Sequence, residues 1–232
     1  MKKLAASVAA LSLGGIVISA QSQQTPPSNP PATPPTVMAT QQTPPAPASP
    51  PGTAQTQVGG EYTKNAQGRE VYQGGKWITI TYSRPIKRGR DVFGTGENYG
   101  KALLVGGATV WRAGANQSTR LNTEVPLVIG GKTVPAGEYS LFIELKSPTE
   151  WTLIVSSWGA KKNGRDDTPN TLWGSFNYTP DKDVARAPMA VTKLNMSLDQ
   201  LTWAFADVTK DAGKIAIAWD TTLAAVPFTV GK

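Results

Sequence analysis

The segment Leu121–Leu145, with the sequence LNTEVPLVIGGKTVPAGEYSLFIEL, decides the fold class of this chain. Apolar and polar residues alternate through much of it, which is the period of a half-buried β-strand and not of a helix. Gly130-Gly131 interrupts the alternation and supplies the positive φ that a tight hairpin needs. Pro135-Ala136-Gly137 marks a second turn. The segment therefore predicts several short strands in close succession.

Period-two alternation continues on both sides of this segment. Trp77–Tyr82 alternates large apolar residues with threonine, and Trp151–Val155 is a further short apolar run. Toward the C-terminus the same period runs through 201–206, 215–219 and 226–230. Because many short strands separated by turns are typical of sandwiches and barrels, we expect an all-β fold. A sandwich is favoured over a barrel, because nothing in the sequence enforces closure. The fold would be a single antiparallel β-sandwich, jelly-roll-like or Ig-like, of about 8–10 strands with little helix.

The 232-residue chain divides by composition into three parts. Residues 1–20 have the pattern of a signal peptide, with Lys2 and Lys3 before an apolar run. Residues 21–58 are rich in Pro, Thr and Gln and cannot bury enough apolar surface to fold, so we expect a disordered linker or tail. Residues 59–232 remain as the β-sandwich domain. We therefore expect an exported protein, with no membrane span once the signal is cleaved.

The chain contains no histidine and no cysteine, and this excludes most familiar active sites. Ser-His-Asp and Cys-His catalysis, zinc hydrolysis and thiol redox chemistry each need one of the two. Carboxylate chemistry survives, and Glu138 and Glu144 would lie on the same face of one strand. Glycoside hydrolysis needs two carboxylates at a fixed separation, which a sequence does not reveal. The loop 161–170 offers oxygen ligands for calcium, but its spacing matches no EF-hand. We predict no cofactor, no metal site and no catalytic residue, which favours a role other than catalysis.

The stretch Val110–Asn116 places a guanidinium and an amide among residues that otherwise read as buried. A buried charge costs several kcal/mol unless it is paired or hydrogen-bonded. Arg112 and Asn116 therefore mark either an internal brace or the floor of a ligand pocket.

Arg84 and Arg186 also border apolar strands. A converging set of guanidinium groups could grip an anionic ligand, because their forked donors match carboxylates and phosphates. Each arginine could equally pair with an internal carboxylate, and Asp91 and Asp183 are the nearest in sequence. Both interpretations stay open at this point.

Trp158 and Trp173 fall in a long connection, rich in Gly and Asn, between two predicted strands. Long ordered loops are often functional. Exposed tryptophans would make a stacking platform for a sugar ring or an anchor for a partner protein. The alternative is that the two rings cap the open end of the sandwich.

The formal net charge is +7, but the basic residues are scattered and not clustered. No nucleic-acid-binding signature accompanies them, so we expect no nucleic acid as a partner. The expected partner is an anionic small molecule, a glycan or an envelope protein.

Four blocks of the sequence resemble the exported bacterial proteins of the DUF2911 family, from about Lys76 to the C-terminus. The blocks are Thr81-Tyr82-Ser83-Arg84-Pro85 with Lys87-Arg88-Gly89-Arg90 and Phe93-Gly94; Trp111–Asn116 with Thr119; Gly130-Gly131-Lys132 with Pro135–Phe142; and Trp151–Ile154 with Trp158-Gly159. The resemblance implies a secreted or periplasmic β domain that is uncharacterised. Two features depart from the family pattern: the apolar, glycine-rich stretch Ala102–Val110 precedes Trp111, and Gln117 stands where an acidic residue is expected.

Three functions are compatible with these observations. The favoured one is a noncatalytic β-sandwich that binds a ligand or partner in the cell envelope, with Arg84, Arg112 and Asn116 as its polar centre. The second is a carboxylate-dependent hydrolase that acts on envelope glycans. The third is a structural surface module on a Pro-rich spacer.

Overall fold

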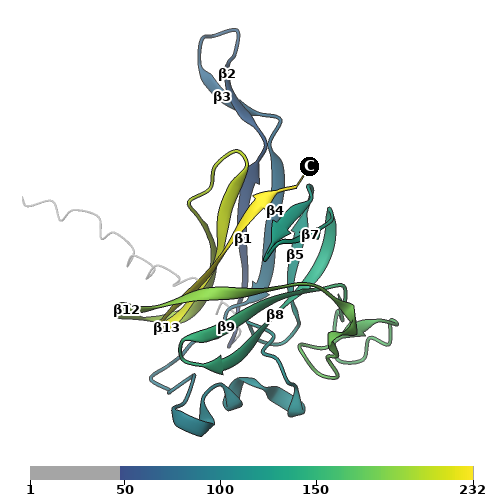
Figure 1. Cartoon of the computed structure of the whole chain (residues 1–232), viewed down its shortest axis with the longest axis vertical. Helices are drawn as coiled ribbons and strands as arrows, with labels where there is room; N and C mark the ends of the chain where they lie inside the picture. Colours follow the sequence, from purple (N-terminus) through teal and green to yellow (C-terminus); the bar gives the residue numbers. More distant parts are fainter. Residues whose placement is uncertain (1–47, 232) are drawn as a thin grey trace, which may run out of the picture. The chain divides into compact units, whose positions relative to one another are not determined.

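The computed structural model describes residues 48–231, which fold mostly into β-strands (Figure 1). The strands are β1 (Pro51–Val58), β2 (Glu61–Lys64), β3 (Glu70–Gln73), β4 (Lys76–Ser83), β5 (Thr119–Thr123), β6 (Leu127–Ile129), β7 (Lys132–Val134), β8 (Gly137–Ser147), β9 (Glu150–Ser156), β10 (Gly159–Ala160), β11 (Thr171–Leu172), β12 (Asp183–Ala206) and β13 (Ala212–Val230). Short 3-10 helices occupy connections: η1 (Gly96–Asn98), η2 (Lys101–Leu103), η3 (Val105–Gly107) and η4 (Pro180–Lys182). The predicted all-β class is confirmed. The predicted signal peptide and most of the Pro-rich segment lie outside the described residues.

Nine of these strands form one antiparallel sheet in the order β1-β4-β5-β8-β9-β12-β13-β6-β7. The long strand β12 connects β9 to β13 in this order: its residues 183–189 pair with β9, and its residues 190–206 pair with β13. The register of the second pairing shifts on either side of Leu198, as it does where a strand carries β-bulges. β12 also contacts the chain after β4, where the Leu201 N–H donates to the Pro85 carbonyl oxygen at 3.0 Å. The jelly-roll-like or Ig-like sandwich stays a prediction.

The segment that decides the fold class forms β5 to β8 as its turns predict. Gly130 and Gly131 have φ values of 58° and 75°, and they close a hairpin in which Ile129 faces Lys132. A residue with a Cβ adopts two such φ values in succession only at a cost, so the glycine pair sets the hairpin. The predicted strands on both sides of this segment are also present.

The first strand lies within the segment that composition assigned to the linker. β1 pairs with β4 along its whole length, from Pro51 opposite Ser83 to Val58 opposite Lys76. Ala54 and Val58 are buried in the core. The Pro/Thr/Gln composition did not predict this strand, because the strand is stabilised by pairing with β4, which lies outside this segment. The folded domain therefore begins before residue 59.

Two apolar clusters pack on opposite faces of β8 and β9. Leu141 and Ile143 belong to the large core, whereas Phe142 between them belongs to a smaller cluster. Alternate residues of a strand point to opposite faces, so the smaller cluster covers the outer face. Its members are Val110, Phe142, Ile154, Leu172 and Tyr178, with Trp158 packed against them. The long connection 157–182 is therefore anchored over this outer face.

Among residues 48–231, no helix is long and apolar enough to cross a lipid bilayer.

Candidate functional site

The stretch Val110–Asn116 folds so that two of its apolar residues enter the core while Arg112 points away from it. Trp111 and Ala113 are 1% and 0% exposed. The Trp111 N–H donates to the Ile143 carbonyl oxygen at 2.8 Å, which holds this stretch in extended form beside β8. Neighbouring side chains of an extended chain point to opposite sides, so burial of Trp111 and Ala113 directs Arg112 outward. Ala113 and Asn116 then adopt positive φ, 52° and 59°, and turn the chain back.

Arg112 lines a hollow of about 260 Å³ that opens to solvent. The residues around the hollow are Val105, Gly106, Arg112, Asn116, Trp173, Ser175 and Phe176. Arg112 Nη1 donates to the Asn116 carbonyl oxygen at 2.8 Å and so closes the turn. Gly174 makes room for the guanidinium, because a Cβ at that position would lie 2.5 Å from Arg112 Nη1. The structure therefore brings together Arg112, Asn116 and Trp173 of the predicted site.

The Arg112 guanidinium is partly buried, and no ion pair to it is present among residues 48–231. Burial lowers the pKa of Arg112, because desolvation disfavours the charged form. In the part of the chain that the structure describes, no carboxylate lies within ion-pair distance of it. A guanidinium has five N–H donors and stays protonated in proteins, and Asn116 occupies one donor. Among residues 48–231, the other donors of this guanidinium make no hydrogen bond.

Arg84 lies outside this hollow and acts as an internal brace. Its Nε donates to the Leu201 carbonyl oxygen at 3.4 Å, and its Nη2 donates to Thr202 Oγ1 at 3.3 Å. Its aliphatic part packs against Gly52, where a Cβ would lie 2.4 Å from Arg84 Cδ. Arg84 thus ties the end of β4 to β1 and β12.

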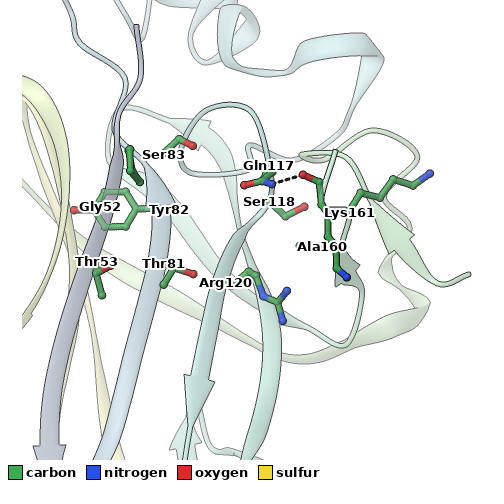
Figure 2. A pocket seen from close by; sticks show the side chains of 12 residues that line it. Gly52, Thr53, Thr81, Tyr82, Ser83, Gln117, Ser118, Arg120, Ala160 and Lys161 are labelled. Atoms are coloured by element: carbon green, nitrogen blue, oxygen red, sulfur yellow. Dashed lines mark hydrogen bonds between the residues drawn. The ribbon is translucent and has the colours of Figure 1, made fainter. Parts of the chain in front are cut away.

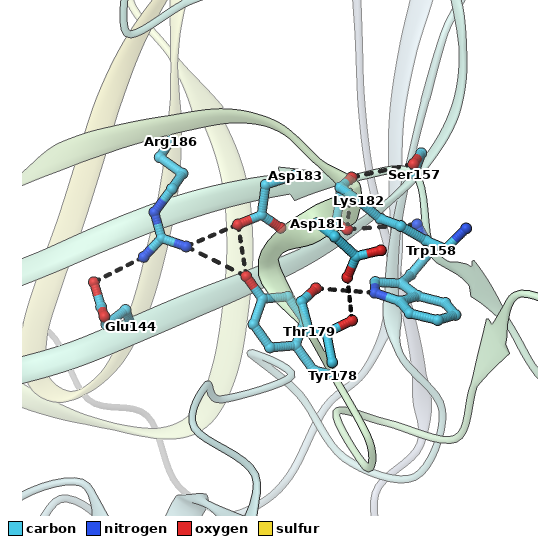
Figure 3. Close-up of polar contacts among 10 residues, drawn as sticks. Glu144, Ser157, Trp158, Tyr178, Thr179, Asp181, Lys182, Asp183 and Arg186 are labelled. Carbon is cyan, nitrogen blue, oxygen red and sulfur yellow. Dashed lines mark hydrogen bonds and ion pairs between the residues drawn. The ribbon is translucent and has the colours of Figure 1, made fainter.

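Arg186 is held in an ion-pair network (Figure 3) and does not line the Arg112 hollow. Its Nη1 donates to Asp183 Oδ2 at 2.8 Å, and its Nη2 donates to Glu144 Oε2 at 2.9 Å. Tyr178 Oη also donates to Asp183 Oδ2, at 2.6 Å. Burial, together with this bond to Asp183, raises the pKa of the Tyr178 phenol above its ordinary range. Of the two carboxylates weighed from the sequence, Asp91 and Asp183, Arg186 contacts Asp183.

The two tryptophans of the long connection have different surroundings. Trp158 packs against the smaller apolar cluster, and its Nε1 donates to the Thr179 carbonyl oxygen at 3.1 Å (Figure 3). The Lys182 ammonium lies 4.8 Å from the centre of the Trp158 ring. Trp173 instead lines the Arg112 hollow beside Phe176, whose side chain is 52% exposed. Trp158 anchors the connection, whereas Trp173 forms part of the wall of the Arg112 hollow.

A second hollow, of about 280 Å³, lies where sequence reasoning placed no site (Figure 2). Thr53, Thr81 and Arg120 face one another across β1, β4 and β5 and line its floor. Arg120 pairs with Glu138, so its charge is already compensated. Gln117, one of the two departures from the family pattern, also lines this hollow and donates from Nε2 to the Lys162 carbonyl oxygen at 2.5 Å. Only the strand register brings these residues together, and no local sequence signal marks it.

The carboxylates considered for hydrolysis are both engaged in ion pairs. Glu138 and Glu144 lie on β8 at the predicted even spacing, but Glu138 pairs with Arg120 and Glu144 with Arg186. The geometry does not present them as a free pair flanking one hollow.

The loop 161–170 uses its oxygen atoms to close on itself. Asp166 accepts hydrogen bonds from the Thr168 hydroxyl at 2.6 Å and from the Lys162 N–H at 2.8 Å, and these bonds lower the pKa of Asp166 to about 2. Asn163 Oδ1 accepts the Arg165 N–H at 2.9 Å. In the described part of the chain, no three His, Cys, Asp or Glu side chains gather as a metal site would require.

Comparison with curated proteins and with solved structures gives no match. A family model described as "Protein of unknown function (DUF2911)" matches residues 64–228, which include Arg84, Arg112, Asn116 and the long connection. The resemblance of the four sequence blocks is thereby confirmed. The chain belongs to the DUF2911 family.

Proposed function

We propose that this protein is a noncatalytic binding protein of the bacterial cell envelope that holds a small anionic molecule at Arg112. The observation that carries this proposal is a partly buried guanidinium that faces a solvent-open hollow and has no carboxylate partner among the described residues. Partial desolvation of a charge is costly when nothing compensates it. An anion in the hollow would compensate it.

The walls of the hollow indicate what the rest of the ligand is like. Trp173, Phe176 and Val105 supply apolar surface on the sides, and Asn116 supplies a polar edge. At about 260 Å³ the hollow lies just below the range of sites for drug-sized molecules. A carboxylate or phosphate monoester with a short aromatic or aliphatic part fits this combination, because its anionic group meets the guanidinium while its apolar part lies against the rings.

The envelope location rests on the sequence. The basic start and apolar run of residues 1–20 are typical of a signal peptide, and the Pro-rich stretch that follows is typical of a spacer. Absence of cysteine means that export would not require disulfide formation.

The test is a thermal-shift and calorimetric screen of the purified protein against benzoate, phenylacetate, short fatty acids and phenyl phosphate. We expect at least one anion to bind the parent and to lose at least ten-fold in affinity on Arg112→Met. Arg112→Lys should retain part of the affinity, because it keeps the charge and loses the fork. Arg69→Met is the matched control, since Arg69 is exposed on the β2–β3 hairpin.

The same variants distinguish a ligand-binding role of Arg112 from a purely structural one. Arg112 makes one side-chain hydrogen bond, to Asn116, so Arg112→Met should cost only about 1 kcal/mol of unfolding free energy. Equal anion binding by parent and Arg112→Met, or a loss of stability several times larger with binding intact, would show that Arg112 serves the fold and not a ligand.

A further inference from the structure

A third hollow, of about 590 Å³, lies beside the β2–β3 hairpin, which extends beyond the ends of β1 and β4 (Figure 1). Three aromatic rings, Tyr62, Tyr72 and Trp77, line it. The other lining residues are Gln57, Gly60, Val208, Thr209 and Lys210. The hollow is separate from the Arg112 hollow, because the two share no lining residue.

The ring of Tyr72 is held in one position by its surroundings. The Gly60 N–H donates to Tyr72 Oη at 3.0 Å. A Cβ at Gly60 or at Gly75 would lie about 2.5 Å from Tyr72 ring atoms, so the ring packs directly on the backbone of both glycines. Tyr62 faces Tyr72 across the hairpin and contacts it edge-to-face, with ring centres 5.2 Å apart. The Tyr72 ring is therefore held in place, and the exposed Tyr62 ring lies against it.

Trp77 is placed by its backbone. Its N–H donates to Glu124 Oε2 at 2.8 Å, and its carbonyl oxygen accepts the Glu124 N–H at 3.0 Å. The side chain nonetheless stays 43% exposed, and that of Tyr62 is 73% exposed. Exposed aromatic surface beside the held Tyr72 ring favours a ligand that stacks, because a ring that is already held loses little freedom on binding.

The charges in this hollow are already paired, which indicates a neutral ligand. Lys210 is the charged residue of the lining, and its ammonium contacts the Glu61 carboxylate at 2.5 Å. The hydrogen bond between them lowers the pKa of Glu61 and raises the pKa of Lys210, so both remain charged over a wide pH range. An anion or a cation would have to compete with this pair.

Polar groups around the rings are available for hydrogen bonds. Within residues 48–231, the Gln57 amide, the Trp77 Nε1–H and the Tyr62 hydroxyl have no hydrogen-bond partner. They offer donors and acceptors at the edges of flat apolar faces. A pyranose ring needs this combination, since its C–H face stacks on an aromatic ring while its hydroxyl groups lie around the edge.

We propose that the hollow formed by Gln57, Tyr62, Tyr72 and Trp77 binds a neutral carbohydrate. The ligand would be a β-linked pyranose chain of the glucose or N-acetylglucosamine type, whose equatorial substituents leave both ring faces free to stack. The site does not depend on the anion site at Arg112.

The experiment titrates the full-length protein with cellohexaose, chitohexaose and maltohexaose and follows tryptophan fluorescence and heat of binding. Trp77 is an exposed reporter within the hollow. We expect saturable binding of at least one β-linked hexasaccharide, weaker binding of the α-linked maltohexaose, and little dependence on salt. Trp77→Ala and Tyr62→Ala should each weaken binding by roughly ten-fold or more.

A third variant tests whether the ring must be held in place. In Gly75→Ala the new Cβ would lie 2.4 Å from Tyr72 Cε1 and 2.9 Å from Gln57 Oε1, so it displaces the ring and the amide without removing either. Affinity should fall several-fold with the melting temperature nearly unchanged. Phe176→Ala, an exposed ring of the Arg112 hollow, is the matched control and should bind the saccharide like the parent.

Two results would overturn the proposal. The first is no binding of any of the three hexasaccharides by the parent at millimolar concentration. The second is a dimer in sedimentation that Trp77→Ala or Tyr62→Ala dissociates, because the rings would then be covered by a second copy of the chain. Arg112→Met distinguishes this site from the anion site, because it should leave saccharide binding unchanged.

Discussion

Replacement of Arg186 by methionine should destabilise the domain and leave anion binding at Arg112 intact. The Asp183 side chain is only 7% exposed, and its Oδ1 is buried without a hydrogen-bond partner among the described residues. Its Oδ2 accepts from Arg186 Nη1 at 2.8 Å and from the Tyr178 hydroxyl (Figure 3). Without the guanidinium, a buried carboxylate would keep the phenol as its one polar contact.

The size of the effect follows from these contacts. Removal of one partner of a buried ion pair costs about 3–5 kcal/mol. The Arg186 side chain is 38% exposed, so water reaches it and the lower end of this range applies, about 3 kcal/mol. For a domain of this size each kcal/mol lowers the melting temperature by about 2–4 °C, so the variant should melt roughly 6–12 °C below the parent.

The assay is urea unfolding of the parent, Arg186→Met, Asp183→Asn and the double variant. The double variant should be more stable than Arg186→Met, because it no longer buries an unpaired carboxylate. Arg120→Met is the matched control: its pair with Glu138 is exposed on both sides, so the loss should stay below about 1 kcal/mol. Two results would contradict this account. One is a loss of unfolding free energy in Arg186→Met no larger than in this control. The other is a double variant that is no more stable than Arg186→Met.

Two further perturbations test other parts of the structure. Burial tends to raise the pKa of Asp220, but hydrogen bonds from Lys87 and Ser197 outweigh it and hold that pKa below the ordinary 3.8. The stability from this group is therefore present above its unfolded pKa and is lost as the pH falls through the folded one. Parent and Asp220→Asn should differ by about 1 kcal/mol near neutral pH, and urea titrations should show this difference shrinking as the pH falls below the ordinary 3.8 and vanishing below the folded pKa. A difference that persists in acid would contradict this assignment. Phe142→Ala should cost about 3–5 kcal/mol in unfolding free energy, because Phe142 is fully buried in the smaller cluster. It should also weaken anion binding, because that cluster anchors the connection that carries Trp173. An unchanged affinity in calorimetry would show that the smaller cluster does not position the Arg112 hollow.

Many of the strands can be predicted from local sequence patterns. The alternation in Leu121–Leu145 and the glycine pair 130–131 predict the strands and the hairpin, because side-chain period and positive φ are properties of neighbouring residues. β1 was hidden because its stability comes from pairing with β4. β12 and β13 each join runs that the sequence separates into shorter strands, because β-bulges carry the chain through a bend without ending the strand.

Some properties of the candidate site could likewise be predicted from the sequence, and others required the tertiary structure. The sequence by itself determined that the site would lack histidine and cysteine chemistry, that the chain resembles the DUF2911 family, and that Arg112 stands in apolar surroundings. Only the tertiary structure decided that Arg84 and Arg186 brace the fold while Arg112 faces a hollow. The physical reason is that an arginine is recognisable from its neighbours in sequence, whereas the groups that its side chain contacts come from other strands, as they do at Arg84 and Arg186.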